Sequence, residues 1–219
     1  MKPELLILVK YEYWYNLIQA LHQHQIPVVV VSAIFRANQN FFKRNGKNWF
    51  AQKLGLIDHF FVQNEKSAEL LHSIHINQVS IAGDTRFDRV KNLVNETFSD
   101  DKIEKFKKDH QLIVIGSSWP QDEKLYQHYI AQNGLPKNWK ILIAPHEIDE
   151  NSIIEIQKKF PEAIRYTQYK EHTNTQIMIL DTIGMLSKIY AWADLVHIGG
   201  GFGAGIHNTL EAATYGNPI

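Results

Sequence analysis

Apolar runs rich in Val, Ile, Leu and Phe alternate along the chain with polar segments of helical periodicity. The runs are short and nearly continuous, which is typical of parallel strands that helices cover on both faces. Such a run followed each time by a helical segment predicts doubly wound α/β units. The strand-like runs occupy residues 5–9, 26–33, 59–63, 78–83, 111–116, 140–145, 176–180 and 195–201.

Segment 91–110 interrupts this alternation, because it is heavily charged and holds no strand-like run. It suits a connecting helix or a domain boundary. We therefore expect two Rossmann-like, doubly wound parallel-sheet domains, at residues 1–95 and 96–219. The first has about four strands where five or six are typical. The second stops at Asn217-Pro218-Ile219, where another strand would begin, so both domains are expected to be incomplete at the chain ends.

Composition limits the kinds of partner and chemistry. The chain has 23 Lys plus Arg, 23 Asp plus Glu and no Cys. The balanced charge argues against attraction of the whole molecule to nucleic acid or to an anionic membrane, so any anion site must be local. Without Cys there is neither a disulfide nor thiolate chemistry. The longest apolar run, 26–34, is far shorter than the roughly 20 residues of a membrane helix.

A glycine-rich turn at residues 199–205 follows the last strand-like run. Gly199-x-Gly201-x-x-Ala204 fits a loose dinucleotide fingerprint, but no acidic residue follows about 20 positions later as that motif requires. Two interpretations stay open for the predicted helix after the turn. Its N-terminus could hold a phosphate, with Glu211 accepting hydrogen bonds from a ribose diol. Alternatively, Asn208 caps the helix and Glu211 completes a capping box.

The other strand ends of the second domain also carry small, polar or imidazole groups, and ligands of open α/β sheets bind at such ends. Ser117 and Ser118 suit phosphate contacts or a strand-end turn, and His146 suits a phosphate donor or a loop cap. Glu12 is a weak candidate for a general base, with a solvated surface residue as the alternative. No His pair has a third ligand at a recognised spacing and no Asp-x-Asp occurs, so no metal site is expected.

Six segments resemble, in order, motifs of the 3-deoxy-D-manno-octulosonic acid (Kdo) transferases of lipopolysaccharide synthesis. For example, "GSSWPQDE" is similar to the family's Ser-Thr-His-Pro-Gly-Glu-Glu, and "GIHNTLEAATYGNPI" to its Gly-His-Asn-Pro-Leu-Glu-Pro-Ala. "APHEIDE" is similar to Pro-Arg-His-Pro-Glu-Arg, and "DTIGML" to Asp-Thr-x-Gly-Glu-Leu. The matching segments are 3–35, 60–88, 116–123, 144–150, 181–202 and 205–219, so the resemblance extends in order along nearly the whole chain.

The resemblance implies a GT-B glycosyltransferase that takes CMP-Kdo in the second domain and a lipid A precursor on the side of the first. It implies no cofactor besides this donor and no nucleic acid. It also implies peripheral contact of the full-length protein with the cytoplasmic side of the bacterial inner membrane. The implied donor contacts are Ser117, Ser118, Pro145, His146, Ile183, Gly184, Met185, Gly200, Gly201, Asn208, Thr209, Leu210 and Glu211.

In the family, a membrane-proximal segment and a Gly-Glu with the proposed catalytic base precede the matched part. The resemblance therefore predicts that this chain alone is a soluble, inactive fragment. Ala144-Pro145 stands where the family has Pro-Arg, which puts one donor-phosphate contact in doubt, and Met185 stands where it has Glu. The alternatives are a differently specific or non-catalytic nucleotide-sugar-binding protein and a Rossmann-type NAD-linked enzyme.

Overall fold

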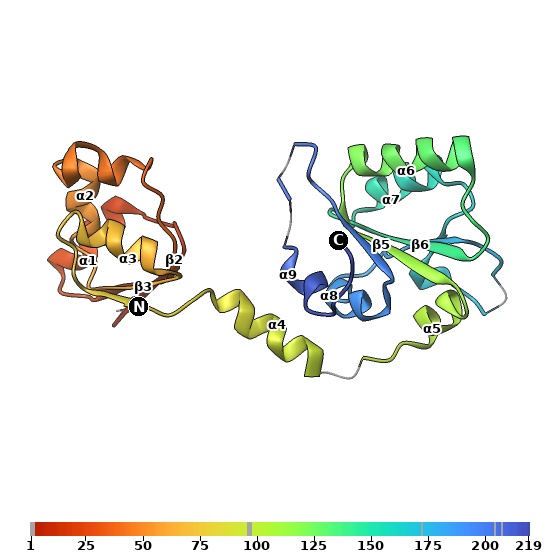
Figure 1. Cartoon of the computed structure of the whole chain (residues 1–219), viewed down its shortest axis with the longest axis horizontal. Helices are drawn as coiled ribbons and strands as arrows, with labels where there is room; N and C mark the ends of the chain where they lie inside the picture. The colour runs from red at the N-terminus through yellow and green to blue at the C-terminus, as the bar shows by residue number, and fades with distance from the viewer. Residues whose placement is uncertain (1–2, 96–97, 172, 204, 207) are drawn as a thin grey trace. The chain divides into compact units, whose positions relative to one another are not determined.

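The chain divides into two compact units, Met1–Arg86 and Phe87–Ile219 (Figure 1). A computed structural model describes residues 3–95, 98–171, 173–203, 205, 206 and 208–219. The division falls inside helix α4 (Thr85–Asn95), before the expected boundary at residues 95 and 96. The later turns of α4 pack on the second unit, where Val90 is buried and its carbonyl accepts a hydrogen bond from Thr214 Oγ1 at 3.5 Å.

The first unit is a four-stranded parallel sheet in the order β1-β2-β3-β4. Each strand corresponds to one of the first four predicted runs. The strands are β1 (Leu6–Val9), β2 (Val28–Ala33), β3 (His59–Val62) and β4 (Val79–Ile81), and the helices are α1 (Tyr15–Gln23), the 3₁₀ helix η1 (Asn40–Gly46), α2 (Trp49–Leu54) and α3 (Glu65–His72).

One face of this first sheet is open, contrary to the expectation that helices cover both faces. Leu8, Val30 and Phe60 belong to one buried cluster on the inner face. On the outer face, Ile7 is 55% exposed and Ile81 58% exposed. The physical reason is the strand order. Right-handed crossovers that run in one direction across a sheet place all their helices on the same face.

The second unit is a five-stranded parallel sheet in the order β7-β8-β6-β5-β9. The chain starts at β5 in the interior and returns to β9 on its other side, so crossover helices cover both faces. The strands are β5 (Gln111–Ser118), β6 (Trp139–Pro145), β7 (Ile164–Arg165), β8 (Ile177–Ile179) and β9 (Leu195–Ile198).

Helices α6 (Pro120–Asn133) and α7 (Glu150–Lys159) lie on one face of the second sheet, and α5 (Asp101–Lys107), α8 (Leu186–Ile189) and α9 (Leu210–Ala213) lie on the other (Figure 1). The 3₁₀ helices are η2 (Tyr166–Gln168) and η3 (Tyr190–Trp192). Alternate residues of β5 enter two separate cores, because Val114 packs with α5, α8 and α9 and Ile115 packs with α7. This unit is doubly wound, as predicted.

Candidate functional site

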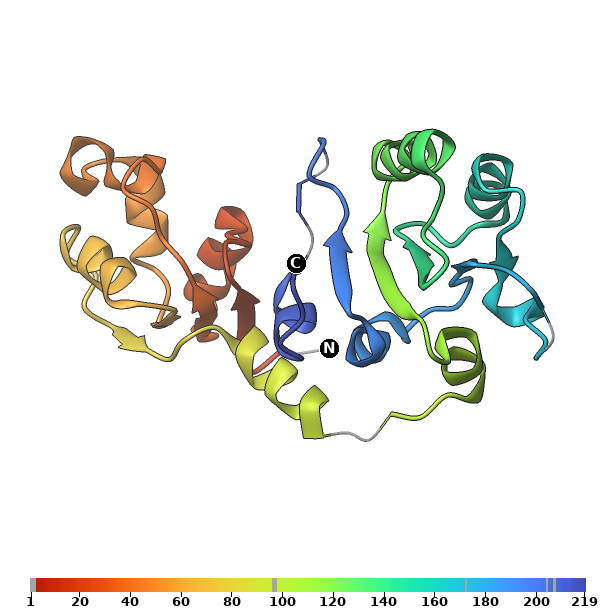
Figure 2. The same ribbon diagram turned by 45° about the vertical axis from the view of Figure 1, so that its right-hand side comes forward.

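The carboxyl ends of four neighbouring strands, β9, β5, β6 and β8, form one edge of the second sheet. The chain reverses its direction across the sheet between β5 and β9, and ligands of open α/β sheets bind at such switch points. Figure 2 shows β5 and β9 side by side. Ser117 and Ser118 end β5, Pro145 and His146 end β6, and Gly200 follows β9. The sheet therefore places most of the predicted donor contacts along a single edge.

A buried carboxylate, Asp122, ties the loop after β9 to the start of α6. Its Oδ2 accepts hydrogen bonds from the backbone N–H groups of Trp119 at 2.9 Å and Gly200 at 3.0 Å. Its Oδ1 lies 3.4 Å from Nε2 of His197 on β9. Asp122 is only 1% exposed, so these partners replace its hydration. Asp122 thus fixes the glycine-rich loop against α6.

Two glycines at this edge are required by close packing. A Cβ on Gly116 would lie 1.9 Å from the Tyr190 hydroxyl oxygen, and a Cβ on Gly199 would lie 2.3 Å from the Ser117 carbonyl oxygen. Burial, and secondarily the Glu211 carboxylate, raise the pKa of Tyr190, so this phenol stays neutral beneath the sheet edge. Gly199 therefore serves close backbone contact with β5, a role that the dinucleotide fingerprint did not indicate.

Three residues at the edge have left-handed backbone conformations: Ser117 (φ 50°), Gly184 (φ 86°) and Gly200 (φ 92°). Glycine adopts such angles without steric cost, whereas serine does so with strain. Ser117 lies where the pairing of β5 with β6 shifts register, between Gly116 and Ser118. Strained residues of this kind cluster at binding and catalytic sites, so the bulge marks this strand end as a candidate site.

A cavity of about 260 Å³ lies at the ends of β5 and β6, where α6 and α7 begin. The rings of Trp119 and His146 stack there with centroids 4.6 Å apart. The Ser118 hydroxyl donates to Glu123 Oε1 at 3.1 Å, and Glu123 is in turn paired with Lys159. Ser118 is buried, so its hydroxyl supports the wall of the cavity. His146 is exposed, so it is more accessible to a ligand than Ser118.

A second cavity, of about 250 Å³, lies at the switch point between β5 and β9. Asp122, Gly200, Phe202 and Gly203 line it together with Trp119. The Tyr126 ring packs against His197 with centroids 5.5 Å apart, and burial, followed by the charge of Asp122, raises the pKa of Tyr126 to about 12. Neither Asp122 nor His197 is among the site residues predicted from the sequence.

The loop after β8 holds Ile183, Gly184 and Met185 at the same edge of the sheet. Ile183 is 88% exposed, and Met185 packs against a hydrophobic core while its sulfur accepts a hydrogen bond from Thr182 Oγ1 at 3.1 Å. Within the described residues no hydrogen bond joins Ile183, Gly184 or Met185 to Ser117 or Gly200. Residues 183–185 therefore lie at the same edge of the sheet as Ser117 and Gly200, but no described hydrogen bond connects the two groups.

The structure separates the two parts of the capping interpretation: Asn208 caps the start of the helix, but Glu211 does not complete a capping box. Helix α9 is a single turn, Leu210–Ala213, with Thr209 at its N-cap position. Asn208 Oδ1 accepts a hydrogen bond from Leu210 N at 3.2 Å. The Glu211 carboxylate lies 3.8 Å from the Arg89 guanidinium on α4, and no hydrogen bond joins it to the described residues before the helix. Gly201 is exposed in the preceding turn, and Ala204 of the fingerprint lies outside the described residues.

Glu12 lies in the first unit, on the exposed segment between β1 and α1. Its carboxylate accepts a hydrogen bond from Trp14 Nε1 at 3.1 Å. Across the described residues, no group of three His, Asp or Glu side chains is placed to hold a metal ion. No helix in that same part of the chain is long and apolar enough to cross a membrane.

Comparisons with known proteins agree with the resemblance in the sequence. Residues 1–89 match the family model of 3-deoxy-D-manno-octulosonic-acid transferase (kdotransferase). The chain is 28% identical to the 3-deoxy-D-manno-octulosonic acid transferase of Chlamydophila psittaci, over 99% of this chain and 51% of that protein. It is 27% identical to a bifunctional glycosyltransferase/methyltransferase of Fusobacterium nucleatum, over 98% of this chain and 34% of that protein.

Solved structures share the fold. The UDP-GlcNAc 2-epimerase of Neisseria meningitidis superposes with a TM-score of 0.54 at 14% identity, over 89% of this chain and 53% of that one. This confirms the predicted class of two Rossmann-like parallel-sheet units. The chain spans about half the length of the Kdo transferase of C. psittaci. The first unit thus matches the family model of the Kdo transferases, and nearly the whole chain is similar in sequence to members of that family.

Proposed function

We propose that the carboxyl edge of the second sheet binds CMP-Kdo, and that the protein transfers Kdo from it to a lipid A precursor. The observation that carries the proposal is the gathering of Ser117, His146 and Gly200 at one sheet edge in a relative of Kdo transferases. The six family-like segments come from distant parts of the sequence. Four of them contribute to this edge or to α9.

The proposed reaction displaces CMP from the anomeric carbon of Kdo by an acceptor hydroxyl. The bond from that carbon to the phosphate oxygen breaks, and the leaving phosphate gains negative charge. Donors that are already in place stabilise this charge more in the transition state than in the ground state. The Ser117 hydroxyl, the His146 imidazole and the Asn208 amide are the donors that we assign to the CMP phosphate.

Glu211 is assigned to the ribose diol of CMP. Its carboxylate is 18% exposed and its described contact is the long ion pair with Arg89, whose side chain is 73% exposed. The oxygen atoms therefore have acceptor capacity left for two hydroxyl groups. A general base must also take the proton from the acceptor hydroxyl, and Glu12 remains the weak candidate for that role.

Calorimetric titration of the chain with CMP, UMP and NAD tests the proposal. We expect CMP to bind more tightly than UMP, with the same affinity in EDTA, because no metal motif occurs in the sequence. His146→Ala should weaken CMP binding by about 0.5–3 kcal/mol, the range for one hydrogen bond to a neutral or charged partner. His128→Ala, at an exposed position of α6, is the matched control.

Three results would contradict the proposal. Binding of NAD without CMP would favour the Rossmann-type enzyme. Strict dependence of CMP binding on added metal would show that a metal site had been missed. Binding of neither nucleotide would favour a non-catalytic partner-binding protein.

A further inference from the structure

The buried carboxylate of Asp122 contacts both of the strand ends that border the proposed nucleotide site. Its Oδ2 atom accepts the N–H of Trp119, just after the end of β5, and the N–H of Gly200, shortly after the end of β9. Trp119 lies two residues after Ser117, to which we assign a contact with the CMP phosphate. A single oxygen atom therefore joins the main chain on the two sides of the site.

The bond to Gly200 also supports the rest of the glycine-rich turn. The Gly200 carbonyl accepts hydrogen bonds from the N–H groups of Gly203 at 3.3 Å and Gly205 at 2.9 Å. Gly200 itself has a left-handed conformation, with φ 92°. Because Asp122 holds its N–H and its carbonyl orders the following residues, the conformation of the turn depends on Asp122.

Gly199 leaves the space through which the carboxylate reaches this turn. A Cβ at Gly199 would lie 2.8 Å from Asp122 Oδ2, in addition to its clash with the Ser117 carbonyl oxygen. The packing between the end of β9 and the start of α6 therefore excludes any larger side chain at this point.

Helix capping accounts for only part of these contacts. Asp122 is the third residue of α6, and its bond to the Trp119 N–H belongs to a capping box. The bond to Gly200 joins a residue 78 positions away along the chain and adds nothing to the capping of α6. Among the described residues Asp122 forms no ion pair with Lys or Arg, and the basic group beside it is Nε2 of His197 at 3.4 Å. Burial of a carboxylate is costly unless hydrogen bonds compensate it, so the bond to Gly200 helps to retain a charge here.

We infer that Asp122 is a positioning residue for the nucleotide site. By joining the ends of β5 and β9, it holds the Ser117 hydroxyl and the glycine-rich turn in the arrangement that receives the CMP phosphate. Asp122 needs no contact of its own with the phosphate, whose negative charge its carboxylate would repel. Groups that are held in place before binding lose less conformational entropy when the ligand binds. The identity of the ligand rests on the proposed function.

Two substitutions at this position separate the hydrogen bonds of Asp122 from its charge. Asp122→Ala removes the oxygen atom that accepts both N–H groups, and it should weaken CMP binding by about 10- to 100-fold. Asp122→Asn keeps an oxygen atom of the same reach and removes the charge, so its CMP affinity should stay close to that of the unsubstituted chain. Calorimetry measures the affinities, and a denaturant melt reports whether each variant is folded. Asp122→Ser, whose single oxygen lies one bond closer to the backbone, replaces Asp122→Ala where that variant does not fold.

Amide hydrogen exchange of the ligand-free chain gives a second, local measurement. The N–H groups of Gly200 and Gly205 should exchange about 10-fold faster or more in Asp122→Ala, because the turn opens more often. Asp122→Asn should protect them as the unsubstituted chain does. The N–H groups in the later turns of α6 should keep their protection. A role in helix capping alone would instead reduce protection in α6 and leave Gly205 unaffected.

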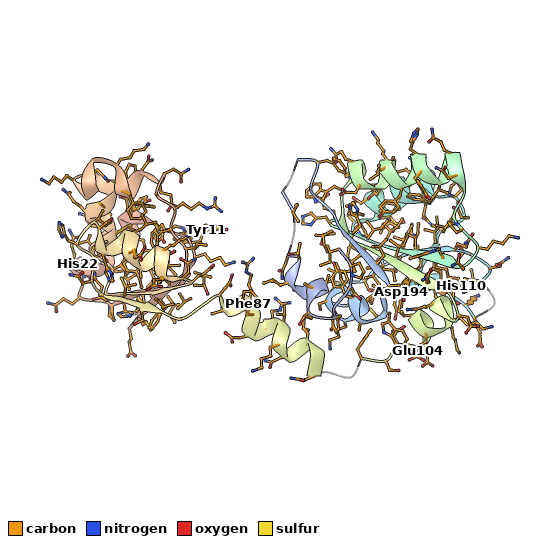
Figure 3. All side chains as sticks on the ribbon, in the orientation of Figure 1. Tyr11, His22, Phe87, Glu104, His110 and Asp194 are labelled. Carbon is orange, nitrogen blue, oxygen red and sulfur yellow. The ribbon has the colours of Figure 1, made fainter. Side chains whose placement is uncertain are left out.

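Asp194, labelled in Figure 3, provides a matched control at the amino ends of the same two strands. Its carboxylate accepts a hydrogen bond from the N–H of Leu112 on β5 at 2.8 Å and pairs with Lys107. Asp194→Ala therefore also removes a carboxylate that joins β5 to the start of β9. It should lower the free energy of unfolding and leave both CMP affinity and Gly200 exchange unchanged.

Three results would overturn the inference: unaltered CMP affinity or Gly200 exchange in Asp122→Ala, equal losses of CMP affinity in Asp122→Ala and Asp194→Ala, or equal losses in Asp122→Ala and Asp122→Asn. The last result would show that the charge of Asp122, and not its hydrogen bonds, determines the affinity. Failure of the unsubstituted chain to bind CMP would contradict the proposed function. Gly200 exchange in Asp122→Ala would still decide whether Asp122 holds the turn, because it is measured without ligand.

Discussion

At the scale of single residues, the surroundings of Glu211 separate two roles for its carboxylate. Among the described residues, the side chain makes no hydrogen bond that would stabilise the start of α9, and its ion pair is long, with the Arg89 side chain 73% exposed. Exposed pairs of this kind contribute about 0–1 kcal/mol. Any large effect of substituting Glu211 should therefore appear in ligand binding.

We predict that Glu211→Gln weakens CMP binding by about 1.5–3 kcal/mol and changes the free energy of unfolding by less than about 1 kcal/mol. Calorimetry and a denaturant melt measure the two quantities. Arg89→Gln is the control, because it removes the same ion pair and keeps the carboxylate. An unaltered CMP isotherm for Glu211→Gln, or equal losses of CMP affinity in both variants, would refute the ribose assignment.

The position of a site residue could be predicted from the sequence where the residue lies at the end of a predicted strand. Ser117, Pro145 and His146 could be placed at the sheet edge because each ends or follows an apolar run. Asp122 could not be assigned, because its partners Gly200 and His197 come from a strand far along the sequence. The signal that was available is an acid three residues after Trp119, at the start of a helix, which is the spacing of a capping box.

At the scale of elements, the two faces of the first sheet should respond differently to substitution. Leu8 and Ile7 are neighbours on β1, but Leu8 is 6% exposed in the core and Ile7 is 55% exposed on the outer face. Removal of a buried Leu side chain leaves a cavity as well as lost apolar burial, whereas an exposed strand position loses mainly strand propensity.

Leu8→Ala is therefore expected to lower the free energy of unfolding by about 2–5 kcal/mol, and Ile7→Ala by about 1 kcal/mol or less. Urea denaturation at low protein concentration compares the two variants with the unsubstituted chain. Equal losses would mean that the outer face is covered in solution. Repeating the comparison at higher concentration would show whether a second copy covers it.

Eight apolar runs predicted strands, and each of them overlaps an observed strand. Strand β7 was not predicted, because Ile164–Arg165 has only two residues and lies in no apolar run. Helix α9 is shorter than its sequence pattern suggests. The prediction that helices cover both faces of the first sheet was wrong. Which faces are covered depends on the strand order and on the placement of the helices, and the hydrophobic periodicity of the sequence reveals neither.

At the scale of the whole molecule, the nucleotide site is assigned to one of the two units, at the carboxyl edge of the second sheet. The tandem α/β class could be predicted, because alternating strand and helix patterns persist along the chain. The division inside α4 differs from the expected boundary, since charge and the lack of a strand do not reveal which unit a helix contacts.

Mapping CMP on the ¹⁵N-labelled chain by NMR tests directly whether the nucleotide binds at the carboxyl edge of the second sheet. At saturating CMP, we predict amide shifts at the ends of the second-unit strands and in α9, with the first unit unchanged. The affected segments should be 117–119, 145–147, 182–185, 199–203 and 208–211. Shifts confined to the first unit, or no shift at saturation, would contradict the assignment of the nucleotide site to the second sheet.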